Sequence, residues 1–76
     1  MEPCMETVNF WINIFKEEKR DIDEEIDDVK GTISNERLFQ KGSRNEDEEM
    51  MHEQNIADNM EYLKWLEQEK DNRLSA

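Results

Sequence analysis

Apolar residues recur in alternating steps of three and four positions over the first 33 residues, and this spacing restricts the fold more than any other feature. Two heptad positions, which we call the seam, carry these residues. The first is occupied by Met1, Val8, Phe15, Ile22 and Val29, and the second by Met5, Ile12, Lys19, Ile26 and Ile33. Such a spacing keeps one stripe of an α-helix turned toward a partner helix. Only Lys19 is polar. We expect its stem to pack while its ammonium reaches a neighbouring carboxylate, the alternative being that it specifies the register of pairing.

The spacing predicts a first helix over about residues 3–30. Pro3 suits a first helical position, where no intrahelical hydrogen bond is lost, and Gly31 suits the residue after a helix C-terminus. Residues 8–15, VNFWINIF, also alternate with a period of two and contain the β-branched and aromatic residues typical of strands. We favour a helix there, because the segment continues in phase into a stretch rich in Glu, Lys and Arg.

Residues 31–43 are expected to form a connector, since Gly31 and Gly42 bound a mostly polar segment. Leu38 and Phe39 are too apolar for a solvated linker, so we expect a short helical turn over residues 35–40 to pack under the helix ends. Residues 43–46 then match the capping box S-x-x-E, in which two side chains satisfy free amides of the first turn. The second helix is therefore predicted over about residues 44–73.

The second predicted helix has two apolar faces. At about 100° per residue, one face carries Ile56, Met60, Leu63 and Leu74, and the opposite face carries Met51, Tyr62 and Trp65. A lone hairpin can bury only the first face, so a second copy, the connector or a partner must cover the other. Large amphipathic rings are favoured in interfaces. We therefore predict a dimer or partner interface at Trp11, Met51, Tyr62 and Trp65.

These elements predict an all-α fold, an acidic two-helix hairpin with a short connecting turn or helix, dimerised into a helical bundle. The 76 residues make a single domain, 1–76, and a chain of this size buries only about 60% of its unfolded surface. Apolar residues make up 34% of the chain and charged residues 41%. A second copy would therefore add buried apolar surface that one chain lacks.

The chain is strongly acidic, with 21 Asp and Glu against 10 Lys and Arg and a net charge of −11. This charge disfavours direct binding to nucleic acid or anionic lipid and favours a basic partner. On a straight helix, six carboxylates would follow at about one per 2.7 Å, between the ~3.4 Å spacing of a single nucleic-acid strand and the ~1.7 Å of a duplex. The predicted acidic face comprises Glu17, Glu18, Asp21, Glu24, Glu25 and Asp28, with Glu46, Asp47, Glu49 and Glu53 on the second helix.

The sequence contains no complete motif for catalysis or metal binding. An EF-hand loop counted from Asp21 would have Ile26 where glycine is needed. His52, which we expect on the surface, is the only histidine, so the zinc motif H-E-x-x-H cannot form. We therefore expect no enzymatic activity, no cofactor and no metal.

The sequence also bears on the cellular setting. Cys4 is the only cysteine, which excludes an internal disulfide and indicates a reducing, cytoplasmic environment. No apolar run approaches the roughly 20 residues of a membrane span, and the N-terminus lacks the basic region of a signal peptide. We therefore expect no contact with a membrane.

We predict a small acidic binding protein that presents carboxylate rows to the basic surface of a DNA- or RNA-binding protein and inhibits or regulates it by nucleic-acid mimicry. The alternative is a coiled-coil adaptor or assembly subunit that binds through apolar helix faces, with the acids serving solubility. Small acidic nucleic-acid mimics, many of them encoded by phages, share this composition but no common motif, so the sequence assigns no family.

Overall fold

The computed structural model describes residues 1–75, which form three α-helices. Helix α1 spans Met5–Glu18, α2 spans Ile22–Lys41 and α3 spans Glu46–Ser75. No strand occurs within residues 1–75, so the predicted all-α class is confirmed. Residues 8–15, for which a strand is the competing prediction, lie inside α1. The two-helix hairpin is wrong in its helix count, because the first predicted helix is divided in two.

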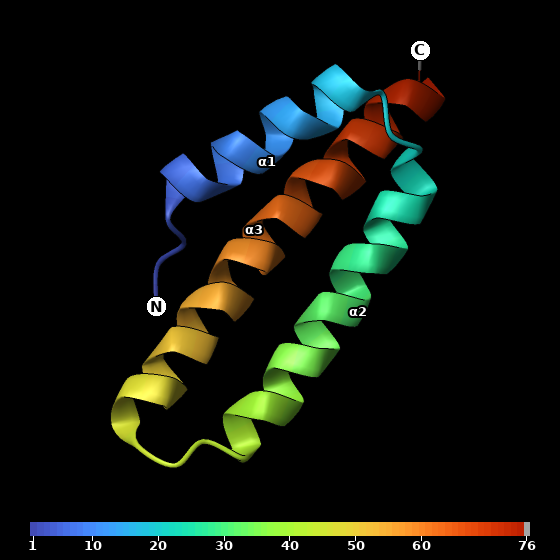
Figure 1. The fold of residues 1–76 in the computed structure, drawn as a ribbon. Helices are drawn as coiled ribbons and strands as arrows, with labels where there is room; N and C mark the ends of the chain where they lie inside the picture. Colours follow the sequence, from blue (N-terminus) through green and yellow to red (C-terminus); the bar gives the residue numbers. More distant parts are fainter. Residues whose placement is uncertain (76) are drawn as a thin grey trace.

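Helix α3 is the element on which both other helices pack (Figure 1). Helix α2 runs antiparallel to α3, whereas α1 runs in the same direction as α3 and crosses its C-terminal half. The molecule measures 47 × 21 × 20 Å, and its length matches the 30 residues of α3 at about 1.5 Å per residue. Helices α1 and α2 make no close backbone approach to each other. Helices α1 and α2 are therefore held in place by packing on α3 rather than on each other.

The chain breaks its helical path at residues 19–21. Lys19 is exposed and left-handed (φ 52°, ψ 44°), and its N–H and that of Arg20 both donate to the carbonyl oxygen of Phe15. Asp21 then starts α2, because its Oδ1 accepts hydrogen bonds from the amides of Asp23 at 2.9 Å and Glu24 at 3.1 Å. The single helix predicted over 3–30 is wrong, and Lys19 is not a packed seam residue. The heptad phase continues across the break and conceals it.

Gly31 lies inside α2, which continues to Lys41, with Gly42 as the residue after its end. A glycine in a helix interior costs about 1 kcal/mol relative to alanine, but Ile33, two residues on, is buried in the core. Burial of a side chain of this size contributes about 1.5–3 kcal/mol, which exceeds the cost of the glycine. The connector predicted over 31–43 is therefore wrong for residues 31–41, and the observed one is residues 42–45.

Helix α3 begins at Glu46, two residues later than predicted. Asn45 Oδ1 accepts a hydrogen bond from the Glu48 amide at 2.9 Å, and Glu48 Oε2 accepts one from the Arg44 amide at 2.9 Å. Ser43 instead donates its hydroxyl to the Phe39 carbonyl at the end of α2. The predicted capping box at 43–46 is thus wrong, because asparagine caps helices as well as serine and Glu48 supplies the reciprocal bond.

The core follows α3 where it meets the other two helices. Leu66 is completely buried and Val8 is 1% exposed. Helix α1 covers the part of α3 that carries Tyr62 and Trp65, so the break at 19–21 lets one chain bury residues of both apolar faces, while Met51, Met60 and Leu74 stay exposed. The buried apolar residues are Val8, Phe15, Ile26, Val29, Ile33, Tyr62 and Leu66. Five of these seven belong to the predicted seam.

Candidate partner-binding surfaces

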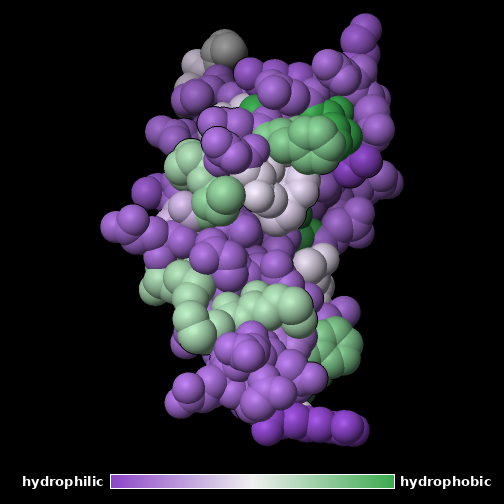
Figure 2. All heavy atoms as spheres, turned by 60° about the vertical axis from the view of Figure 1, so that its left-hand side comes forward, coloured by the Kyte–Doolittle hydropathy of each residue, from purple (hydrophilic) through white to green (hydrophobic). Residues whose placement is uncertain are grey.

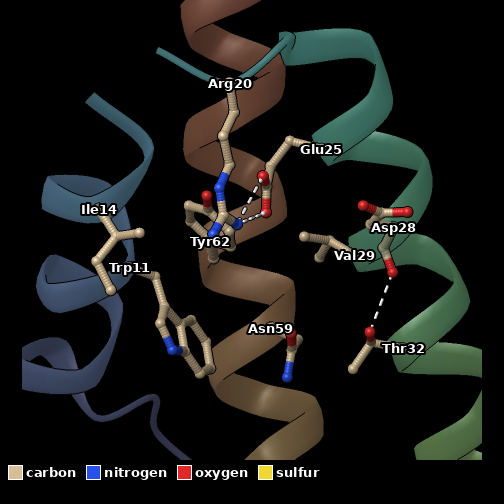
Figure 3. Close-up of a pocket in the computed structure, with 9 residues that line it drawn as sticks. All are labelled: Trp11, Ile14, Arg20, Glu25, Asp28, Val29, Thr32, Asn59 and Tyr62. Carbon is tan, nitrogen blue, oxygen red and sulfur yellow. Dashed lines mark hydrogen bonds and ion pairs between the residues drawn. The ribbon is translucent and has the colours of Figure 1, made fainter. Parts of the chain in front are cut away.

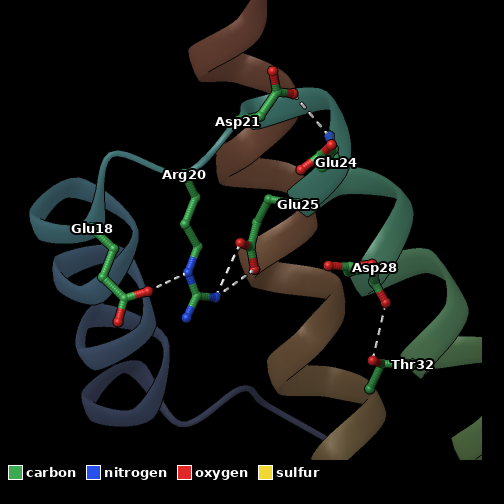
Figure 4. A network of polar contacts seen from close by, with 7 residues as sticks. All are labelled: Glu18, Arg20, Asp21, Glu24, Glu25, Asp28 and Thr32. Carbon is green, nitrogen blue, oxygen red and sulfur yellow. Dashed lines mark hydrogen bonds and ion pairs between the residues drawn. The ribbon is translucent and has the colours of Figure 1, made fainter.

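Arg20 connects the end of α1 to the first turns of α2 (Figure 4). Its Nε donates to Glu18 Oε2 at 2.6 Å, and its Nη1 donates to Glu25, 3.2 Å from Oε2. Hydrogen bonds to Glu18 and then to Glu25 raise the pKa of Arg20. Glu25 is only 8% exposed, and a carboxylate this buried needs a charged or hydrogen-bonding partner. The ion pair with Arg20 meets that need.

Tyr62 lies on α3 next to this ion pair and anchors an array of aromatic rings. It is 4% exposed, and its burial raises the pKa of the phenol, to which the negative charge of Glu25 adds. The Tyr62 ring centroid lies 5.7 Å from that of Trp11 and 6.5 Å from that of Trp65, whose plane is nearly parallel to it at 10°. Aromatic pairs add about 0.5–1.5 kcal/mol beyond their burial. The array therefore fixes α1 on α3.

A groove lies between α1 and α2, with α3 as its floor (Figure 3). Its cavity volume is about 230 Å³. The Arg20–Glu25 pair lies at one end, and Asp28 lies on the α2 side. The apolar lining consists of Trp11, Ile14, Val29 and Tyr62. The groove therefore combines an aromatic lining with charged groups at its edge.

The six acidic residues predicted between Glu17 and Asp28 do not form one row. The helix break falls among them, so the predicted spacing on a straight helix is wrong. Asp21 caps α2, Glu18 pairs with Arg20, and Glu25 is buried. We name the three that are exposed and make no hydrogen bond or ion pair through their carboxylates within residues 1–75 the loop-end carboxylates. They are Glu17, Glu24 and Asp28.

The acidic residues predicted on the second helix lie at the opposite end of the molecule. Because α2 and α3 are antiparallel, the start of α3 lies beside the end of α2 (Figure 1). The stretch of α2 from Glu24 to Lys41 measures about 25 Å at ~1.5 Å per residue. Acidic groups therefore occupy two ends rather than one continuous face. The α3-start carboxylates, all exposed, are Glu46, Asp47, Glu49 and Glu53.

The structure separates the four residues predicted for a dimer or partner interface. Tyr62 is a core residue, so the prediction is wrong for this side chain. Trp65 is partly buried and lies edge-on to Phe15, with ring centroids 5.8 Å apart. Trp11 is partly buried but lines the groove, and Met51 is 55% exposed. Trp11, Met51 and part of Trp65 therefore remain accessible to another molecule, whereas Tyr62 does not.

Asp58 has a structural role that the sequence interpretation missed. It is 5% exposed, and its Oδ1 accepts hydrogen bonds from the Cys4 amide at 2.6 Å and from Gln54 Nε2 at 2.8 Å. Asp58 thereby ties the chain before α1 to α3. Cys4 itself is exposed, and hydrogen bonds from Thr7, first its side chain and then its backbone, lower the pKa of the thiol. The sequence signal that could have indicated this burial is the position of Asp58 beside Ala57, next to the apolar face that carries Ile56.

One ion pair and one histidine–carboxylate hydrogen bond connect α2 with α3 near their ends. Lys70 Nζ lies 2.6 Å from Asp23 Oδ1, and His52 Nδ1 lies 2.6 Å from Glu36 Oε2. His52, expected on the surface, is partly buried by its contact with α2. The Lys70–Asp23 pair is exposed, and exposed pairs contribute about 0–1 kcal/mol. Both contacts join α2 to α3 outside the apolar core.

Large apolar side chains are exposed where α2 ends and α3 begins. Leu38 is 64% exposed, Phe39 59%, Met50 54% and Met51 55%. We name these four residues the hairpin tip. Figure 2 shows that apolar side chains on one face form separate patches within a mostly hydrophilic surface. A large contiguous apolar patch can mark a contact with another protein, whereas apolar side chains exposed singly are common on protein surfaces.

Comparison of the chain with protein-family models, curated proteins and solved structures finds no match. Within residues 1–75, no three His, Cys, Asp or Glu side chains converge so that they could hold a metal ion. In the same residues, none of the helices has the length and apolar character needed to cross a membrane. A proposal about function therefore depends on the exposed carboxylates, the groove and the hairpin tip.

Proposed function

We propose that this chain is a small acidic binding protein that presents carboxylates to the basic surface of a DNA- or RNA-binding protein and inhibits or regulates it by nucleic-acid mimicry. The supporting observation is the shortage of internal partners for the acids. Fifteen of the 21 Asp and Glu residues are exposed. Within residues 1–75, four form ion pairs with Lys or Arg, and a fifth, Glu36, contacts His52. The exposed carboxylates without a partner are available to the cations of another molecule.

The two acidic ends suit a partner that binds an extended polyanion. Their separation of about 25 Å equals about seven base pairs of duplex at ~3.4 Å per pair. A basic groove that accepts a duplex of this length would meet both groups of carboxylates. Electrostatic steering makes such an association fast and sensitive to salt.

We also propose the cellular setting in which the protein acts. This chain binds no nucleic acid and no membrane itself, since its own charge would repel phosphate groups. It requires no cofactor. We place it in the cytoplasm, where a free and exposed thiol such as Cys4 stays reduced.

Capture from the lysate of the native host, followed by competition, tests the proposal. The chain is immobilised, bound proteins are eluted with a salt gradient, and a second portion is challenged with duplex DNA and with RNA. We expect basic nucleic-acid-binding proteins that elute with salt and are released by one of the nucleic acids. Bound proteins that resist both nucleic acids would overturn the mimicry proposal.

Matched variants identify which acidic end binds. One variant neutralises the loop-end carboxylates with Glu17→Gln, Glu24→Gln and Asp28→Asn. The second neutralises three α3-start carboxylates with Glu46→Gln, Asp47→Asn and Glu49→Gln, so that both variants lose the same charge. We expect both to bind the captured protein more weakly while their helix content stays unchanged. Full binding by both variants would contradict the mimicry proposal.

A second candidate function rests on the hairpin tip. Four large apolar side chains, each more than half exposed, lie where α2 ends and α3 begins, and an adaptor or assembly subunit that binds through apolar helix faces would use such side chains. The occupant we propose is a second copy of the chain, which would bury the tip in a homodimer. Sedimentation of the double variant Phe39→Gln and Met51→Gln tests this candidate. A dimer that the variant converts to a monomer supports it, and a monomeric parent protein contradicts it.

A further inference from the structure

We infer that the groove between α1 and α2 is a docking site for an arginine side chain carried by the basic partner. The inference rests on the proposed function and adds the chemical group that the partner presents and the atoms that receive it. The observations that carry it are the size of the groove, the groups on its two sides and the charge at its edge.

The size of the groove favours a single side chain over a free ligand. Its cavity volume is about 230 Å³, whereas small-molecule pockets measure about 300–1,000 Å³. The groove lies between two helices that pack on a third (Figure 3). A long side chain that projects from a partner's surface can reach it without the partner entering.

The groups on the two sides of the groove match a guanidinium. Trp11 projects from α1 on one side, and Asp28 lies on α2 on the other (Figure 3). A planar guanidinium stacks on an indole ring while it donates to a carboxylate, which the compact ammonium of lysine does less well. The carboxylate of Asp28 has no ion-pair partner within residues 1–75. It is therefore available to accept from the guest.

The floor of the groove adds a neutral acceptor. Asn59 on α3 lines the groove, and its Nδ2 donates to the Asn55 carbonyl oxygen at 2.8 Å. This bond leaves Oδ1 of Asn59 as the side-chain atom that can accept a hydrogen bond. Arginine has five N–H donors, enough to engage both Asp28 and Asn59.

The charge at the edge of the groove favours a cationic guest over an anionic one. Asp21, Glu24, Glu25 and Asp28 adjoin this part of the molecule, with Arg20 as the one cation among them. Glu18 and Glu25 already engage Arg20. An anion would have to displace one of these carboxylates. A cation meets an excess of one negative charge from the groove lining itself, where Glu25 and Asp28 face Arg20, and an excess of three when the adjoining Asp21 and Glu24 are included.

Nuclear magnetic resonance of the two indole N–H groups tests the site directly. The chain contains two tryptophans, of which Trp11 lines the groove and Trp65 does not. The probes are a blocked arginine-rich octapeptide and the same peptide with lysine in place of arginine. We expect the arginine peptide to shift the Trp11 signal more than the Trp65 signal, and the lysine peptide to bind more weakly.

Two neighbouring carboxylates provide matched variants. Asp27 and Asp28 are both exposed on α2, but only Asp28 lines the groove. We expect Asp28→Asn to weaken binding of the arginine peptide about three- to fivefold, as for a partly exposed ion pair. Asp27→Asn removes the same charge and should leave the affinity nearly unchanged.

The outcomes separate the groove from the wider proposal. No binding of the arginine peptide at low salt, binding without a Trp11 shift, or equal losses in both variants would each overturn the groove as the docking site. The mimicry proposal fails by a different measurement, namely resistance of the captured protein to competing nucleic acid. Each idea can thus be rejected without the other.

Discussion

Replacement of Gly31 by alanine should stabilise the protein. Gly31 is exposed in the interior of α2, and an added Cβ would meet no atom of residues 1–75 within 4 Å. The added methyl group therefore causes no steric clash. The free energy of unfolding should rise by the difference in helix propensity between glycine and alanine, about 0.8–1.0 kcal/mol. For a domain of this size, a change of 1 kcal/mol shifts the midpoint of thermal unfolding by about 4–8 °C.

Thermal unfolding followed by circular dichroism measures this change. Ser34→Ala, at another exposed position of α2, is the matched control and should give a smaller gain, within the roughly 0.7 kcal/mol range of ordinary residues. The sign of the Gly31 effect is decisive. If residue 31 were the left-handed end of a helix, as the sequence predicts, alanine would destabilise the protein by about 1 kcal/mol. A lowered midpoint would therefore refute the continuous helix.

Three further predictions concern the core, the helix break and alkaline pH. Leu66→Ala should lower the free energy of unfolding in urea by about 3 kcal/mol, whereas Leu38→Ala, at a position that is 64% exposed, should change it little. Lys19→Gly should raise it by about 0.5–1 kcal/mol, because glycine relieves the cost of a left-handed lysine. Burial raises the pKa of Tyr62 in the folded protein, so above about pH 10, the ordinary pKa of tyrosine, the unfolded chain loses this proton first. The free energy of unfolding should therefore be constant with respect to Tyr62 below about pH 10 and fall as the pH rises further. Tyr62 is the only tyrosine, so the rise in tyrosinate absorbance and the loss of helix should occur at the same pH. Tyrosinate formation at an ordinary pKa with the helices intact would contradict the burial of Tyr62.

The helical class and most of the core follow from the sequence because both depend on local spacing. Val8, Phe15, Ile26, Val29 and Ile33 are in the predicted seam and are buried. The break at residues 19–21 does not follow, because Phe15, Ile22 and Val29 keep their seven-residue spacing across it. The N-cap residue Asp21 could have been identified from the sequence, since aspartate followed by an acidic first turn is a helix-start signal. The stronger periodic pattern concealed it.

The groove could not be predicted, because it depends on where α1 lies relative to α2. That position results from contacts between residues far apart in the chain, such as Trp11 with Tyr62 and the Cys4 amide with Asp58. Spacing along one helix carries no information about such pairs. The burial of Glu25 likewise depends on Arg20 turning back from the loop, a geometry that only the break produces.

The structure changes which carboxylates can test mimicry. From the sequence, Asp21 belongs to the acidic face as fully as Glu24 does. In the fold, Asp21 holds the first turn of α2 and Glu25 balances Arg20 beside the core. Reversing the charge of either residue would disturb the helix end or the packing, so a loss of binding would say nothing about the partner. Neutralising Glu24 with Glu17 and Asp28 removes charge and leaves every hydrogen bond made by a side chain within residues 1–75 in place. A loss of binding in that variant therefore reports on electrostatic contact with the partner.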